Sequence, residues 1–391
     1  MLSEEQLQVL MQKILGLYER MEDDLLSNIA KRFTTSEEIT PDTVLEWQVK
    51  KLQELGALRK ENLELLAKYS DKTLNEIIKI ITDAGFMALE TDEEIYETAH
   101  KEGKLEKKPM PAKMSPVLKQ IVQGAISNTK EYFNMINTTA LETSKKGFLD
   151  IINQTYLETS LGITDYNTAI RKAVRNLADK GITGATYISK NGKVTRNHID
   201  VAVRRAILTS TSQTAGEMQI QRAKEWGSNL VEVTSHSGSR PEHARWQGKV
   251  YSLEGGTSRY PNLKQATRYG EVDGLKGVNC KHDFYPYFAG ISERTYKPYP
   301  LRENKEKYEQ SQKQRYLERE VRKQKRRVLM AEEIGDTELK QNAQLKLKER
   351  ERQLKAFTKE TGRTRRRNRE QVLDFGHSEA TKAVWADRKN R

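Results

Sequence analysis

The sequence predicts a mainly α-helical, multi-domain protein that carries a small, loop-rich α+β module. Hydrophobic residues make up only 36% of the 391 residues and charged residues reach 31%, a balance typical of long solvated helices with narrow apolar stripes. Prolines cluster over 109–116 and 241–300, which leaves long stretches free to form helices. From His236 to Gly290, glycines and aromatic residues follow one another without a helical period, which indicates the α+β module.

These patterns divide the chain into four consecutive segments. A helical N-terminal region (1–108) is followed by a helical middle region (109–229). The compact α+β module (230–300) comes next, and a basic helical tail (301–391) completes the order. The chain is long enough for two or three domains of ordinary size.

The N-terminal region is expected to open with a helix whose apolar residues recur at alternating steps of four and three. That spacing gives a seam that packs against a neighbouring helix or against a partner chain. Proline at the favoured first position predicts a second helix from Thr40-Pro41 to Gly56. Two shorter helices, Leu63–Tyr69 and Leu74–Met87, then precede a linker over 103–116. The seam consists of Leu7, Met11, Ile14, Tyr18, Met21 and Leu25.

The middle region is expected to be helical on both sides of a β-hairpin. Lys190-Asn191-Gly192 is a strong hairpin-turn signal between two β-prone runs. Trp226 and Trp246 flank the next β-prone run and are predicted to be core anchors. The elements predicted are helices over 117–180 with breaks at Gly147 and Gly162, a helix from Ile199 to Trp226 that Gly227 ends, and a strand over Leu230–Thr234.

The tail combines a narrow apolar stripe with most of the chain's excess positive charge. The stripe runs from Leu317 to Leu354 with a turn at Gly335-Asp336, so a helical hairpin or a docked helix is expected. Residues 301–391 hold 27 basic and 16 acidic residues, a net charge of +11 out of +13 for the chain. This asymmetry predicts a polyanion partner such as duplex DNA; a solvated helical face is the alternative. The residues expected to contact phosphates are Arg363, Arg365, Arg366, Arg367 and Arg369, which as an alternative form a disordered basic tail.

Cysteine usage and hydropathy restrict where the protein assembles. A single cysteine allows no intrachain disulfide, so assembly in the reducing cytoplasm of a host cell is expected. No apolar run approaches the roughly 18 residues of a membrane helix, and MLSEEQLQVL lacks the features of a signal peptide. We therefore expect no membrane partner.

Four of the chain's seven His and Cys residues lie close together in the α+β module. His236 and His243 frame the run HSGSRPEH, and Cys280 and His282 lie two positions apart. Imidazole and thiolate are the ligands that zinc prefers, so these four residues are candidate ligands of a zinc ion. Their spacing matches no standard zinc finger, and the alternative is that they are buried hydrogen-bonding groups that hold a small module together.

The hypothesis that the same residues catalyse a reaction has less support than metal binding or hydrogen bonding. Cys280 with His243 or His282 could serve as nucleophile and base, and His243, Asn262 and His282 loosely resemble a metal-dependent nuclease set. The sequence has none of the GxxxxGK[ST], GxSxG, HExxH or GxGxxG motifs in a catalytic context. We therefore expect no catalytic function.

The region around these residues resembles the phage minor capsid protein 2 family. The resemblance is carried by HSGSRPEHARWQGKVYSLEGG (236–256), YPNL (260–263) and YGEVDGLKGVNCKHDFYPYFAGISERTY (269–296). Weaker likeness extends over LYERMEDDLLSNIAKR, GITDYNTAIRKAVRNLADKGI, HIDVAVRRAILTSTSQTAGE and QRYLEREVRKQKRR. More remotely, the module is similar to the head-morphogenesis module of Mu-type phages. The defining positions besides the four His and Cys residues are Arg240, Pro241, Gln247, Gly248, Gly277 and Asn279, and Ser239 stands where the family often has alanine.

The resemblance implies a minor head protein of a tailed phage of Gram-positive hosts. It implies that the protein is located in the virion head, associates with the portal or the inner shell, and takes part in procapsid assembly together with the major capsid or scaffold proteins. Two alternatives remain: a genome-organising or ejected DNA-binding head protein, and a metal-dependent hydrolase delivered with the genome.

Overall fold

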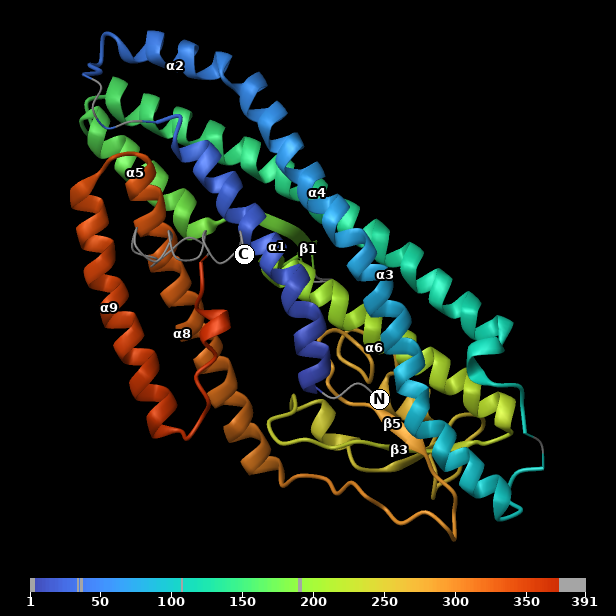
Figure 1. Ribbon diagram of the computed structural model, residues 1–391. Coiled ribbons are helices and arrows are strands. Elements are labelled where there is room, and N and C mark those ends of the chain that lie inside the picture. Colours follow the sequence, from blue (N-terminus) through green and yellow to red (C-terminus); the bar gives the residue numbers. More distant parts are fainter. Residues whose placement is uncertain (1–3, 34, 36–37, 107, 189–191, 373–391) are drawn as a thin grey trace, which may run out of the picture. The chain divides into compact units, whose positions relative to one another are not determined.

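A computed structural model describes residues 4–33, 35, 38–106, 108–188 and 192–372 (Figure 1). Long helices dominate it and only two small antiparallel sheets are present in the described part, so the predicted fold class is confirmed. The helices are α1 (Glu4–Ala30), α2 (Val44–Gln53), α3 (Leu55–Lys101), α4 (Pro116–Ser160), α5 (Tyr166–Lys180), α6 (Ile199–Trp226), α7 (Leu263–Thr267), α8 (Leu301–Glu333) and α9 (Thr337–Glu360). The strands are β1 (Thr183–Ile188), β2 (Val194–His198), β3 (Leu230–Val233), β4 (Val250–Ser252) and β5 (Phe284–Pro286).

The N-terminal helices differ from the prediction in their boundaries. Helix α2 begins at Val44, because Pro41 lies in a turn in which the Thr40 carbonyl accepts from the Thr43 N–H. Gly56 does not end a helix but lies in the first turn of α3, which replaces both predicted short helices with one. An added Cβ at Gly56 would meet no atom within 4 Å, so this glycine reflects no packing constraint. The predicted linker does separate α3 from α4.

The seam of α1 is buried within the protein. Tyr18, Met21 and Leu25 are each fully buried, and the Tyr18 hydroxyl donates to Asn137 Oδ1 at 3.1 Å. The side chains of Leu7 and Met11 lie outside the described residues. The seam was predicted to pack either against a neighbouring helix or against a partner chain. From Tyr18 onward, its described part packs within this chain.

The elements around the hairpin follow the prediction closely. β1 and β2 pair antiparallel from Thr183 opposite His198 to Ile188 opposite Val194, while turn residues 189–191 lie outside the described part. Helix α6 ends at Trp226, and Gly227 adopts the positive φ of 71° that glycine tolerates. Gly147, predicted to break a helix, lies within α4, where an added Cβ would stand 2.8 Å from Leu177.

The described chain divides into two compact units, each assembled from three separate stretches. One unit contains residues 1–16, 70–136 and 200–312, and the other contains residues 17–69, 137–199 and 313–391. The division into four consecutive segments, which was made from the sequence, stays a prediction. Among the described residues, no helix contains an apolar stretch of the length that a membrane span requires.

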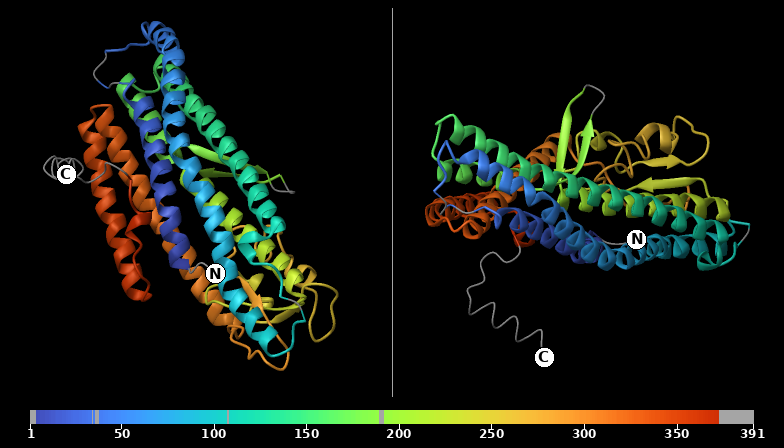
Figure 2. Two further views of the ribbon diagram at one scale, coloured as in Figure 1. Left: turned by 45° about the vertical axis from the view of Figure 1, so that its right-hand side comes forward. Right: turned by 90° about the horizontal axis from the view of Figure 1, so that it is seen from above.

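The second unit ends in the predicted helical hairpin. Helices α8 and α9 lie side by side (Figure 2). Leu317 and Val321 of α8 form a buried cluster with Leu347 and Leu354 of α9, so the narrow apolar stripes of the two helices cover each other. The turn between them is built as predicted, because Asp336 caps α9 by accepting from the Leu339 N–H at 2.8 Å.

The core of the first unit joins the α+β module to two long helices. β3 is the central strand of a three-stranded sheet in the order β4-β3-β5. Trp226 of α6 stacks on Tyr96 of α3 with ring centroids 5.6 Å apart. Both lie in one buried cluster with Val231, Trp246 and Cys280, which confirms the two tryptophans as core anchors. The module therefore depends on α3 and α6 for its core.

Candidate functional site

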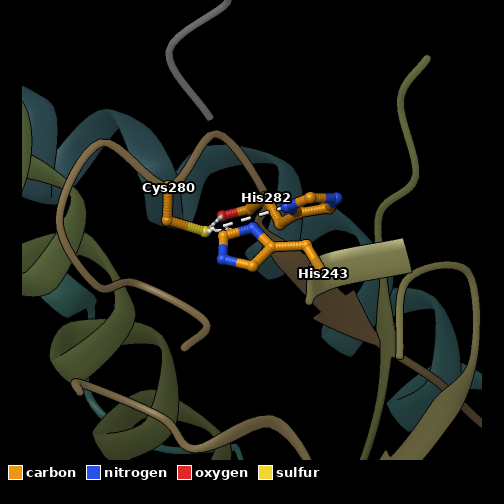
Figure 3. Close-up of side chains that lie close together, drawn as sticks. All are labelled: His243, Cys280 and His282. Carbon is orange, nitrogen blue, oxygen red and sulfur yellow. Dashed lines mark hydrogen bonds between the residues drawn. The ribbon is translucent and has the colours of Figure 1, made fainter. Parts of the chain in front are cut away.

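Three of the four predicted metal ligands converge at one point of the α+β module (Figure 3). His243 begins a short 3-10 turn, His243–Arg245, and Cys280 and His282 lie just before β5. Cys280 Sγ lies 4.0 Å from His243 Nδ1 and 3.8 Å from His282 Nδ1. One donor atom from each residue lies within 4.8 Å of the other two.

The cluster is buried, and burial decides its protonation. His243 and His282 are 2% and 1% exposed, and Cys280 is 8% exposed. Burial lowers the pKa of His243 to about 4 and that of His282 to about 2, with the charge of Arg240 acting in the same direction. Burial also raises the pKa of the Cys280 thiol. In the absence of another partner, two neutral imidazoles therefore face a neutral thiol.

The hydrogen bonds of the outer ring nitrogens fix both tautomers. His243 Nε2 lies 3.0 Å from the Asp273 carbonyl oxygen, which can only accept, so this nitrogen carries the proton. His282 Nε2 lies 2.9 Å from Gln247 Oε1. The His236 backbone N–H donates to the same oxygen at 3.2 Å, which fixes the orientation of the Gln247 amide and makes His282 Nε2 the donor. Both Nδ1 atoms thus direct a lone pair toward Cys280.

His236 lies beside the cluster but outside the group of converging donors. Its ring stacks on His282 with centroids 4.3 Å apart, and its Nδ1 lies 3.2 Å from the Ser237 carbonyl oxygen. The structure therefore brings together three of the four predicted ligands and places the fourth against the ring of one of them.

The other motif residues build the loops that carry the cluster. Arg240 donates to the carbonyl oxygens of Val272 and Val278, which ties the loop before His243 to the loop before Cys280. Pro241 lies in the turn that enters the 3-10 turn, and Asn279 adopts a positive φ of 54°. Gly248 packs so tightly that a Cβ would stand 2.8 Å from the Lys297 backbone, and Gly277 similarly abuts the Glu271 carbonyl.

Asn262, the remaining member of the nuclease-like set, has a structural role. Its Oδ1 caps α7 by accepting from the Gln265 N–H at 3.1 Å, and its Nδ2 donates to the Gly255 carbonyl at 2.8 Å. Because His243, Cys280 and His282 are all buried, a substrate would reach them only if the module opened. This arrangement suits the stabilisation of a fold better than turnover.

Three of the five arginines predicted to contact phosphates interact with neighbouring side chains. Arg366 makes a two-pronged ion pair with Glu318 of α8 at 2.9 and 2.8 Å, and Arg365 pairs with Glu370. Arg363 donates to Gln314 at 2.7 Å, whereas Arg367 is exposed. Arg369 closes the short 3-10 turn Arg367–Arg369. The charge of Arg365 and Arg366 is therefore balanced within the unit.

A second buried polar group in the same unit as the His/Cys cluster was not anticipated from the sequence. Lys276 has no exposed side-chain surface and forms an ion pair with Asp283 at 2.7 Å. Gln219 of α6 bridges Asp92 Oδ2 and the Phe284 carbonyl, and burial raises the pKa of Asp92 to about 8. The only sequence signal was the position of Lys276 and Asp283 beside the Cys280 motif.

The structure thus combines long helices with a buried His/Cys cluster in a loop-rich module. The model of the family described as phage minor capsid protein 2 matches residues 2–359. The chain belongs to the phage minor capsid protein 2 family, as its sequence motifs predicted. It is accordingly a structural component of a phage virion.

Two relatives agree with this assignment. The chain is 27% identical over 343 residues to a structural protein of Lactococcus phage LL-H, covering 85% of this chain and 88% of that one. It is 36% identical over 118 residues to a structural protein of Lactococcus phage mv4, covering 30% of this chain and 95% of that one. No solved structure matches the chain.

Proposed function

We propose that this protein is a minor head protein that is built into the procapsid and binds the portal or the inner face of the shell. The observation that carries the proposal is the extent of the family match, which spans both compact units and the His/Cys cluster. The whole described fold, rather than one module of it, therefore supports a capsid role. The apolar stripe of α1 from Tyr18 onward and the facing stripes of α8 and α9 are buried, so binding would use other, exposed surfaces of the chain.

Cross-linking of purified procapsids tests the location. We expect lysines of this chain to cross-link to the portal or to inward-facing residues of the major capsid protein. Procapsids assembled without the portal are the control: a portal-bound chain is absent from them, and a shell-bound chain is retained. Cross-links confined to tail proteins or to the outer shell surface would contradict the proposal.

We also propose that the tail hairpin binds packaged DNA, as the tail's net charge of +11 favours. Since Arg365 and Arg366 are paired with acids, DNA binding would rely on other basic groups. Lys346, Lys355 and Lys359 of α9 are exposed, as is Arg367. Binding through such groups is independent of sequence and depends on salt, because neutralising each phosphate releases counterions.

Substitution on α9 measures this binding. Replacing Lys346, Lys355 and Lys359 by Gln should weaken duplex binding and reduce the slope of log K against log salt by about 0.9 for each phosphate that is no longer neutralised. Removing the entire tail is unsuitable, because Arg326 and Arg327 of α8 form ion pairs with Glu22 and Asp179 elsewhere in the same unit. The matched control replaces three exposed lysines of α3, Lys60, Lys79 and Lys101. Equal binding by both variants would identify the basic surface of α9 as a solvated face only.

A further inference from the structure

The His/Cys cluster leaves more acceptors than donors when it holds no ion. Both Nδ1 lone pairs face Cys280 Sγ, at 4.0 and 3.8 Å, but a thiol carries one proton and donates weakly. At least one buried imidazole nitrogen thus lacks a donor from within the cluster. An unsatisfied buried polar atom is costly, and an ion placed among the three donors would satisfy all of them.

We propose that Cys280 Sγ and the Nδ1 atoms of His243 and His282 bind one zinc ion that stabilises the α+β module. A thiolate with two imidazoles is a soft donor set, which favours zinc over magnesium or calcium. Tetrahedral zinc with ligand distances of about 2.0–2.3 Å requires donors roughly 3.5 Å apart. The two sulfur–nitrogen separations are 3.8 and 4.0 Å and all three donors lie within 4.8 Å of one another, so binding requires the donors to approach by up to about 1 Å.

The surroundings of the cluster orient it as a metal site requires. Ligating histidines usually donate their second ring N–H to a carbonyl or carboxylate, which fixes the ring and makes the ligating nitrogen more basic. His243 does so to the Asp273 carbonyl, and His282 does so to the buried Gln247. Gln247 is itself oriented by the His236 N–H. These hydrogen bonds give Gln247 a positioning role that explains its full burial.

His236 covers the site rather than completing it. Its ring stacks on His282, and its Nδ1 faces the carbonyl of its own loop. The fourth coordination position then falls to a water molecule. Zinc binding displaces the thiol proton of Cys280 to solvent, so affinity should fall at low pH as protons compete. The positive charge of Arg240, which also lowers the pKa of His282, disfavours a bound cation, and the negative charge of the Cys280 thiolate offsets this.

The zinc content of the full-length protein tests the proposal. Protein purified without chelator and dialysed against zinc should retain about one ion per chain, whereas Cys280→Ser and His243→Ala should retain about a tenth of that or less. The control that should keep a full ion is His100→Ala in the same unit, where His100 Nδ1 faces the Leu105 carbonyl at 2.7 Å. A wild-type protein that retains no zinc would overturn the proposal, as would retention by Cys280→Ser.

Cobalt substitution of the wild-type protein covers the case in which a variant fails to fold. Cobalt bound by a thiolate gives a charge-transfer band in the near ultraviolet, together with intense visible bands if the site is tetrahedral. We expect both, and their absence at saturating cobalt would also overturn the proposal. If Gln247 is a positioning residue, Gln247→Ala should lose zinc. Gln247→Glu, which keeps the accepting oxygen, should recover part of the binding. These measurements use isolated protein, so they are independent of where it lies in the head.

Discussion

Replacing Glu22 by Gln is expected to destabilise the second unit by about 3–5 kcal/mol, because it leaves Arg326 buried without its counter-charge. The Glu22 side chain is 1% exposed and forms an ion pair with Arg326 of α8, which is 9% exposed. Glu22 Oε1 also accepts from the Ile182 N–H at 2.9 Å. Glutamine can keep its oxygen for the Ile182 N–H, and its –NH2 group then replaces the oxygen that accepts from Arg326. The variant therefore removes both the charge and the hydrogen bond of the ion pair.

Hydrogen exchange measures this effect separately from the first unit. A destabilisation of about 3–5 kcal/mol should reduce the protection of peptides from α5 and β1 by about a hundredfold or more. The matched control is Glu332→Gln, which breaks the partly exposed ion pair of Glu332 with Lys340 at 2.6 Å. That change should cost less than about 1 kcal/mol. If the two variants exchange alike, the Glu22 pair does not hold the unit together.

Replacing Gly277 by Ala is expected to disrupt the loop that carries Cys280. An added Cβ would stand 1.9 Å from the Glu271 carbonyl oxygen and 2.9 Å from that of Gly274. Both of these oxygens belong to the backbone of a series of tight turns, which cannot yield as a flexible side chain would. The loop is held by the Gly277 N–H donating to Gly274 and the Cys280 N–H donating to Gly277. We expect a cost of about 3 kcal/mol or more, at the upper end for overpacking.

Peptides covering 268–286 should become less protected in Gly277→Ala while those of α4 keep their protection. Gly124→Ala is the control within the same unit. It lies on an exposed face of α4, and an added Cβ meets nothing within 4 Å. Because alanine favours the helix, this control should be neutral or stabilising by up to about 1 kcal/mol. Unchanged protection of the loop in Gly277→Ala would contradict the packing described for it.

The parts of the fold that were predictable are those with strong local signals. Gly227 ends α6 because it supplies a positive φ, and Gly335-Asp336 ends one helix and caps the next. Gly56 misled for a physical reason: glycine within a helix costs only about 1 kcal/mol, which the tertiary packing of a long helix offsets. Gly147 also lies within a helix. Glycine is required at this position because the nearby Leu177 leaves no room for a side chain.

The residues of the His/Cys cluster were predictable from the sequence, whereas their environment was not. Residue type and proximity in sequence identified His243, Cys280 and His282, and the resemblance to the family identified Gln247 and Gly277. The outer hydrogen bond of His243 goes to a backbone carbonyl, which any residue at position 273 would supply. Likewise, no local pattern indicates that Arg366 meets Glu318, 48 positions away. Such interactions arise only from the tertiary structure.

This chain is proposed to be part of the head before the genome enters. Quantitative mass spectrometry of DNA-free and DNA-filled heads from one lysate, which gives its copy number relative to the major capsid protein in each, is the most direct test. We predict the same number in both. Presence only in filled heads would identify an escort of the genome instead, and absence from both would contradict a head location altogether.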